Sequence, residues 1–171
     1  GCGNTSLPNP STIRFGITPE GALCLHQGAT DIGQGSNTVI AQIAADALGA
    51  PLDQITLIGP DTALTPDCGK TSASRQTYVT GKAAEAAGRA LRAEILRRTN
   101  LSEVSSISLE GARMTVRNGM EAREIDLSQM AANVHGYALM AEETYDPPTT
   151  ALDENGQGTP YAVYGYGAQI A

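Results

Sequence analysis

The sequence is short of cysteine, of positive charge and of long apolar runs. Its three cysteines, Cys2, Cys24 and Cys68, form no CxxC pair, which argues against a disulfide framework and against a zinc site. The formal charge of −7 argues against a general binder of nucleic acid or of anionic membranes. No apolar run reaches the roughly 20 residues that span a bilayer. We therefore expect a cytoplasmic protein with no membrane span and no nucleic-acid partner.

The positive charges that are present gather in one part of the chain. Seven of the 11 Lys and Arg residues lie between positions 70 and 98. Such a cluster in an acidic chain fits either a local anion site or a solvated helix face, and from Lys82 onward we expect the solvated face. The 171 residues are enough for one domain or two small lobes. Because the chain starts at Gly1 and stops inside an alternating apolar run, 161–171, we expect a piece of a larger polypeptide.

Hydrophobic periodicity predicts strands and one helix in the first 60 residues. Alternation over 13–17 and 23–25, with a Pro-Glu-Gly turn between them, predicts a β-hairpin. Apolar residues at spacings of three and four then predict an amphipathic helix from Ser36 to Leu48, ending at Gly49. A strand is predicted at 55–57, followed by a loop over 61–71.

The rest of the chain is predicted to hold a long helix and further short strands. The helix should run over 74–98, and its small residues, including Gly81 and Gly88, allow another backbone to approach closely. Strands are expected at 107–109, 114–116, 125 and 138–144, with a hairpin turn at 118–119, a Ser128-capped helix over 128–134 and an exposed loop over 146–160. The fold class is therefore α+β, with short antiparallel or mixed sheets against two main helices. We expect a lobe over 1–100 and a second α+β lobe, incomplete at its C-terminus, over 101–171.

The first candidate site is a glycine-flanked turn between a strand and a helix, Gly33-Gln34-Gly35. A helix N-terminus presents free backbone N–H groups and the positive end of the helix dipole, which favours an anion. The spacing almost matches a phosphate loop, but Gln34 stands where the lysine should be. The Gln34 amide offers an acceptor and two donors, which suits the edge of a heterocycle or an oxo ligand. A plain turn with a helix cap is the alternative.

The second candidate site is the turn at the start of the long helix. Hydroxyls and a guanidinium at a helix N-terminus suit a phosphate or a pyrophosphate. Ser74 as a simple N-cap is the alternative, and the two roles are compatible. The residues of this site are Thr71, Ser72, Ala73, Ser74, Arg75 and Gln76.

Several blocks in register carry a resemblance to a known family. The blocks are Gly28-Ala-Thr-Asp-Ile-Gly-Gln-Gly-Ser-Asn-Thr38, Gln42-Ile-Ala-Ala45, Leu48-Gly49, Asp61-Thr62 and Thr71-Ser-Ala-Ser-Arg-Gln-Thr-Tyr-Val-Thr-Gly81. Over positions 1 to about 95 the chain resembles the molybdenum-cofactor-binding region of the xanthine dehydrogenase and aldehyde oxidoreductase family. The resemblance implies that Gln34 contacts the pterin or the metal ligands, with Gly33 and Gly35 shaping the approach. It implies that 71–76 hold the pterin phosphate or the pyrophosphate of a dinucleotide.

The resemblance also implies what the whole enzyme does and what this chain lacks. Members bind molybdopterin, commonly in bacteria as its cytosine dinucleotide, and hydroxylate aldehydes or N-heterocycles with oxygen from water. The general base, a Glu in a Gly-Glu motif, is expected downstream, so the chain should hold no catalytic residue and be inactive alone. Metal ligands are expected from the pterin sulfurs, and His26 and His135 are read as structural. Implied partners are the rest of the large subunit and domains or subunits with iron–sulfur clusters, with or without FAD.

Two rival functions stay open at this point. One is a stand-alone module that binds an anion or a nucleotide at the two helix N-termini, without catalysis. The other is a purely structural fold with two well-capped helices. Position 32 is Ile, where some aldehyde oxidoreductases carry His, which puts a polar contact beside the cofactor in doubt.

Overall fold

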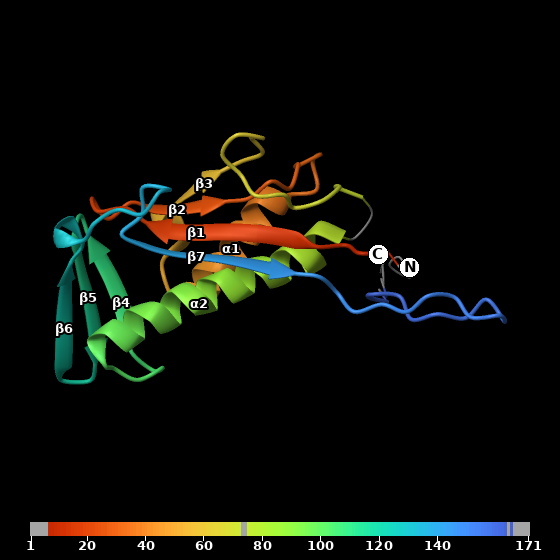
Figure 1. Ribbon diagram of the computed structural model, residues 1–171. Helices are drawn as coiled ribbons and strands as arrows, with labels where there is room; N and C mark the ends of the chain where they lie inside the picture. Colours follow the sequence, from red (N-terminus) through yellow and green to blue (C-terminus); the bar gives the residue numbers. More distant parts are fainter. Residues whose placement is uncertain (1–6, 73–74, 164, 166–171) are drawn as a thin grey trace, which may run out of the picture.

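The structure is a computed structural model that describes residues 7–72, 75–163 and 165. Two candidate site residues, Ala73 and Ser74, and most of the apolar run 161–171 lie outside the described residues. The described residues form two helices and two small sheets, which confirms the α+β class (Figure 1). No helix in this part of the chain is both long and apolar enough to cross a membrane.

The larger sheet has the strand order β3-β2-β1-β7. Its strands are β1 (Ser11–Ile17), β2 (Leu23–His26), β3 (Ile55–Ile58) and β7 (Leu139–Tyr145). The predicted hairpin is confirmed, because β1 pairs antiparallel with β2, and β1 also pairs antiparallel with β7. The pair β2 and β3 is parallel. The alternating side chains of Ile13, Phe15 and Leu25 are fully buried in the core, as the period-two pattern predicts.

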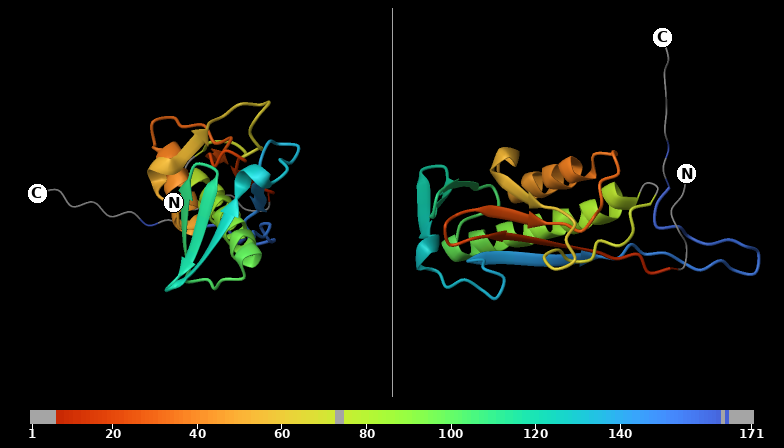
Figure 2. Two further views of the ribbon diagram at one scale, coloured as in Figure 1. Left: turned by 90° about the vertical axis from the view of Figure 1, so that its left-hand side faces the viewer. Right: turned by 90° about the horizontal axis from the view of Figure 1, so that it is seen from above.

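Two helices cover one face of this sheet, α1 (Ser36–Leu48) and α2 (Gly81–Thr99) (Figures 1 and 2). Helix α1 ends at Gly49, whose φ of 80° gives the left-handed cap expected from sequence. The helices cross closely at Gly88, where a Cβ atom would lie 2.9 Å from the Ala44 carbonyl oxygen and 2.7 Å from the Ala47 Cβ. The small-residue stripe of α2 therefore has the packing role that was predicted for it.

A second sheet forms a three-stranded meander at one end of the molecule (Figure 1). Its strands are β4 (Ser106–Glu110), β5 (Arg113–Asn118) and β6 (Glu121–Asp126), all antiparallel. Ile107, Met114 and Val116 turn one face into the core, and the other face is polar and exposed. A two-residue hairpin turn joins β5 to β6, with Gly119 at φ 59°, but its residues are 119–120, one position after the predicted 118–119, because Asn118 still pairs with Glu121.

Three segments differ from the sequence prediction or refine it. The predicted helix over 128–134 is wrong: only a short 3-10 turn, Leu127–Gln129, forms there. Its cap is Asp126, whose Oδ1 accepts from the Ser128 N–H and hydroxyl, so Ser128 lies inside this turn and is not its cap. Before α2, residues Gln76–Thr80 form a π-helical turn instead of regular α-helix. The chain over 146–160 is an exposed arm, as expected, and it folds back through a Thr150–Thr159 hydrogen bond of 3.0 Å.

Strand β7 brings the second half of the chain into the first sheet. It lies beside β1 with Ile17 opposite Leu139 and Ser11 opposite Tyr145. The larger sheet is thus built from both halves of the sequence, and the smaller sheet from the second half. The division into lobes over 1–100 and 101–171 stays a prediction.

Candidate functional site

Both candidate turns follow the two parallel strands of the larger sheet. Strand β2 leads into the first turn, and β3 leads into the loop that ends in the second. Loops at the carboxyl ends of neighbouring parallel strands meet at one edge of a sheet, which is where open α/β sheets bind ligands. The two turns share a single acceptor, because the Thr30 carbonyl oxygen accepts from Gln34 Nε2 at 3.3 Å and from Thr71 Oγ1 at 2.9 Å. The structure therefore brings together two segments that are about 40 residues apart in the sequence.

In the first turn the backbone N–H groups are already bonded within the chain. One carboxylate, that of Asp31, accepts from Gly33 N at 2.8 Å, Gly35 N at 3.4 Å and Asn37 N at 3.1 Å. Hydrogen bonds from the Asn37 and Gly33 N–H groups lower the pKa of the Asp31 carboxyl. The expectation of free N–H groups at this turn is thus wrong, because Asp31 takes the place of an external anion.

The Gln34 side chain is exposed and lies along its own turn. Its Oε1 accepts from Ile32 N at 2.6 Å, and its Nε2 also donates to Ser36 Oγ at 3.2 Å. The flanking Gly33 and Gly35 have φ values of 98° and 77°, and no atom lies within 4 Å of a Cβ built on either. The backbone conformation therefore favours glycine at both positions, and the space beside each glycine is open.

The second turn is held by a chain of side-chain hydrogen bonds. Gln76 is buried, and its Nε2 donates to Thr71 Oγ1 at 3.2 Å while its Oε1 accepts from the Thr80 hydroxyl. Thr80 Oγ1 in turn lies 2.7 Å from Ser11 Oγ on β1. Ser72 is exposed. Of the residues assigned to this turn, Thr71 and Gln76 thus serve the loop itself, and Ser72 faces solvent.

Arg75 points into the protein, with 2% of its surface exposed. Its guanidinium donates to the Asn9 side-chain and carbonyl oxygens, to the Pro10 carbonyl oxygen at 2.5 Å and to the Cys68 carbonyl oxygen. A Cβ on Gly69 would lie 2.5 Å from Arg75 Nη2, so the guanidinium fills the curve of the loop. Burial lowers the pKa of Arg75, and nearby charges, including that of Asp67, act in the opposite direction. The guanidinium thus bonds the loop to the segment before β1. The sequence, in which Arg75 follows the hydroxyl side chains of the turn, did not predict this inward direction.

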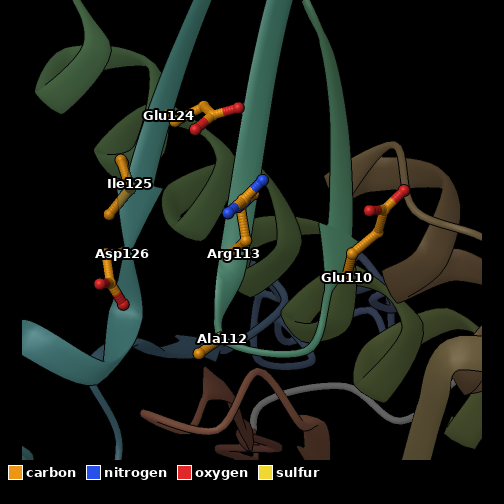
Figure 3. A pocket seen from close by; sticks show the side chains of 6 residues that line it. All are labelled: Glu110, Ala112, Arg113, Glu124, Ile125 and Asp126. Carbon is orange, nitrogen blue, oxygen red and sulfur yellow. The ribbon is translucent and has the colours of Figure 1, made fainter.

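The hollows on the described surface include one near the turns and one far from them. A cavity of about 380 Å³ lies at the carboxyl ends of β2 and β3, and its lining includes Gly28, Thr30, Asp61 and Cys68. A larger cavity of about 550 Å³ lies on the meander, at the other end of the molecule (Figures 1 and 3). Its lining residues are Glu110, Ala112, Arg113, Glu124, Ile125 and Asp126. Only the first cavity adjoins the predicted site residues.

The histidines and acidic residues add no metal centre in this part of the chain. His26 is buried, with Nδ1 3.1 Å from the Leu64 carbonyl oxygen and Nε2 hydrogen-bonded to the Tyr137 hydroxyl. Glu142 forms an ion pair of 2.7 Å with Arg14. Among the described residues, no three His, Cys, Asp or Glu side chains converge as metal ligands.

Sequence reasoning overlooked Thr30 and Asp31 as parts of the site. The available signal was the spacing Asp31-x-Gly33, since an Asp side chain often accepts from the N–H two residues on. No local pattern marks Thr30, because its contribution is a backbone carbonyl.

Comparison with known proteins gives the family. All of residues 1–171 match the family described as molybdopterin cofactor-binding domain. The chain is 36% identical over 84 residues to the putative xanthine dehydrogenase molybdenum-binding subunit of Escherichia coli K12, which covers 48% of this chain and 11% of that protein. It is 29% identical over 153 residues to the 6-hydroxypseudooxynicotine dehydrogenase complex subunit gamma of Paenarthrobacter nicotinovorans, covering 86% of this chain and 19% of that one.

Solved structures share the fold. Reconstituted CO dehydrogenase from Oligotropha carboxidovorans matches with a TM-score of 0.59 and 26% identity, over 80% of this chain and 18% of that one. The aldehyde oxidoreductase from Desulfovibrio desulfuricans ATCC 27774 matches with a TM-score of 0.63 and 22% identity, over 93% and 15%. The chain thus spans less than a fifth of the length of each of these relatives. Because the family match runs through all 171 residues, the chain belongs to the molybdopterin cofactor-binding domain family, of the xanthine dehydrogenase and aldehyde oxidoreductase type.

Proposed function

We propose that the two turns form one wall of a molybdopterin site. In this arrangement Gln34, between Gly33 and Gly35, faces the pterin and the metal ligands. The second turn faces the phosphate end, and its residues are Thr71, Ser72, Ala73, Ser74, Arg75 and Gln76. The observation that carries the proposal is the Thr30 carbonyl oxygen, which accepts from both turns and so fixes them side by side.

The Gln34 amide of the first turn suits the edge of an uncharged ring better than it suits an anion. The Gln34 amide is exposed beside open space, and its current partners are the atoms of its own turn. A pterin edge or an oxo ligand can replace those internal bonds without adding charge beside Asp31. A phosphate at the same place would be repelled by the Asp31 carboxylate. The pterin end of the cofactor therefore fits this turn better than the phosphate end.

The residues of the second turn differ in what they do. Arg75, Gln76 and Thr71 hold the loop in shape through buried hydrogen bonds. Ser72 is the described residue of this turn that offers an exposed hydroxyl to a ligand. We therefore assign phosphate contact to Ser72 and the backbone near it, and loop construction to Arg75.

The whole protein is proposed to be a molybdenum hydroxylase acting on aldehydes or N-heterocycles. The cofactor, when bound, supplies the redox chemistry that joins a water-derived oxygen to the substrate. The turns described above bind and orient it, and the proton-accepting Glu is assigned to sequence beyond this chain. We further propose the cytosine dinucleotide form, partner iron–sulfur clusters with or without FAD, a cytoplasmic location and no turnover by this chain alone. In support, relatives are named as subunits of molybdenum-binding enzymes.

The proposal is tested by replacing Gln34 in the full-length protein. In Gln34→Ala we expect molybdenum content or substrate oxidation to fall about tenfold or more, the usual effect of removing a group that orients a metal centre. Gln129→Ala is the control, because Gln129 is also exposed and lies far along the chain, in the turn after β6. Wild-type molybdenum content together with a wild-type rate in Gln34→Ala would refute the assignment.

The rival module, with an anion at each helix N-terminus, has less support. It requires open N–H groups at both turns, and Asp31 occupies those of the first. Metal analysis of the full-length protein separates the two functions, because the hydroxylase requires bound molybdenum and the module does not.

A further inference from the structure

We infer that Asp31 is the internal counter-anion of the first turn, a positioning residue that excludes phosphate groups and so fixes which end of the ligand this turn receives. The inference rests on the proposed molybdopterin site and adds a determinant of ligand orientation to it.

The geometry of Asp31 is that of a bound anion at a helix N-terminus. Its Oδ1 accepts from Gly33 N at 2.8 Å and its Oδ2 accepts from Asn37 N, in the first turn of α1, at 3.1 Å. These are the groups that would otherwise hold a phosphate or a carboxylate from outside. Helix α1 has no side-chain cap at Gly35, so Asp31 is the charged group that serves this end.

The charge around the first turn supports exclusion. The sequence contains no Lys or Arg between His26 and Gly69, whereas it has Asp31, Asp61 and three further aspartates in that stretch. The first cations that follow are Lys70, just before the second turn, and Arg75 within it. A phosphate at the first turn would therefore meet the Asp31 carboxylate, and that segment of the chain supplies no cation of its own.

Recognition at the first turn is consequently left to neutral groups. Gln34 presents an amide, and Asp31 holds the turn that carries it through the Gly33 and Gly35 N–H groups. Removing the Asp31 charge should turn this place into an ordinary anion site at a helix N-terminus. That change is one that a merely structural role of Asp31 would not produce.

The test is hydrogen–deuterium exchange of the full-length protein, prepared without cofactor, with and without inorganic pyrophosphate. In the wild type we expect pyrophosphate to leave peptides over 31–38 unprotected. In Asp31→Ala we expect exchange over 31–38 to rise about tenfold without ligand, as for loss of a helix cap. We then expect added pyrophosphate to slow exchange over 31–38 in this variant. Asp153→Ala is the matched control, since Asp153 accepts from the N–H groups of Asn155 and Gln157 in the distant arm.

The variants give separate answers on folding and on the proposed function. Asp31→Asn removes the charge and keeps one acceptor oxygen, which can still serve the Gly33 and Gly35 N–H groups that share Oδ1. It should therefore gain pyrophosphate protection even if Asp31→Ala disturbs the turn. Protection of 31–38 in the wild type, or none in both variants, would overturn the inference. Peptides over 66–80 report on the second turn: if pyrophosphate protects them in no protein while Asp31→Asn gains protection over 31–38, the phosphate assignment fails and the inference on Asp31 stands.

Discussion

Replacing the buried Arg75 should loosen the loop of the second turn before it affects any ligand. The Arg75 guanidinium donates to the carbonyl oxygens of Asn9, Pro10 and Cys68, and only 2% of the residue is exposed. Arg75→Met keeps an unbranched apolar side chain at this position but has no N–H group to donate to these oxygens. The variant therefore leaves these three carbonyl oxygens and the Asn9 side-chain oxygen without their donor.

The size of the effect follows from those acceptors. Each buried polar group that loses its partner costs about 1–3 kcal/mol, and returning the cation to water offsets part of the sum. We expect a net loss of about 3–5 kcal/mol, as for other buried charges whose network is broken. Arg89→Met is the matched control, because the Arg89 side chain is 72% exposed and pairs with Glu85 at 2.8 Å on the surface of α2. Loss of that pair should cost within about 0.5 kcal/mol.

Hydrogen exchange of the full-length protein measures this difference locally. A loss of about 3–5 kcal/mol corresponds to exchange that is roughly 10²- to 10⁴-fold faster over 66–72 in Arg75→Met. Molybdenum content should fall with it, because the loop that is proposed to face the phosphate end of the cofactor no longer keeps its shape. The reasoning is refuted if exchange over 66–72 stays at the wild-type rate while pyrophosphate binding is lost, since the guanidinium would then contact the ligand and not the loop.

Two further predictions concern packing and pH. Gly88→Ala should destabilise α2 by about 1–3 kcal/mol, because its Cβ would lie 2.9 Å from the Ala44 carbonyl oxygen, although helix propensity alone favours Ala by about 1 kcal/mol. The exposed Ala93→Gly should cost about 1 kcal/mol from propensity alone, and a stabilised Gly88→Ala in urea unfolding would contradict the close crossing. Burial lowers the pKa of His26, so the unfolded state binds the proton first as pH falls through its ordinary value of about 6.5. The midpoint temperature of thermal unfolding should thus fall between pH 7.5 and pH 5.5. His26→Asn should reduce this dependence on pH more than a substitution of the exposed His135, His135→Asn, does.

Local periodicity predicted most of the fold because burial on one face sets the pattern of a strand or helix. The alternation at Ile13 and Phe15 and the three-and-four spacing at Ile40 and Ala44 both mark the buried face in the structure. Ser128 misled the prediction because a hydroxyl before an apolar stretch resembles an N-cap. In the structure Asp126 caps this turn and also accepts from the Ser128 hydroxyl. The sequence offers both residues as caps and does not show which one serves.

The site was predicted by residue type but not by side-chain direction. Gly33 and Gly35 do have the positive φ values that a glycine-flanked turn requires, and Gln34 is exposed between them. Arg75 was expected to face a phosphate, yet its partners include Asn9, which lies far away in the sequence and comes close only after β1 is in place. Contacts of this kind depend on the folded sheet, so no sequence window around Arg75 contains them.

In each of the two turns a charged side chain makes its hydrogen bonds within the chain. The Asp31 carboxylate binds backbone N–H groups of the first turn. The Arg75 guanidinium of the second turn binds the carbonyl oxygens of Cys68, in the preceding loop, and of Pro10, before β1. Each ion thus stabilises a loop conformation that regular secondary structure does not provide. What remains at the surface of the described turns is largely neutral: the Gln34 amide, the Ser72 hydroxyl and backbone groups. Ligand recognition at the proposed site should therefore depend on shape and on hydrogen bonds to uncharged groups. Asp31 and Arg75 contribute by holding the two loops in the conformation that presents those groups.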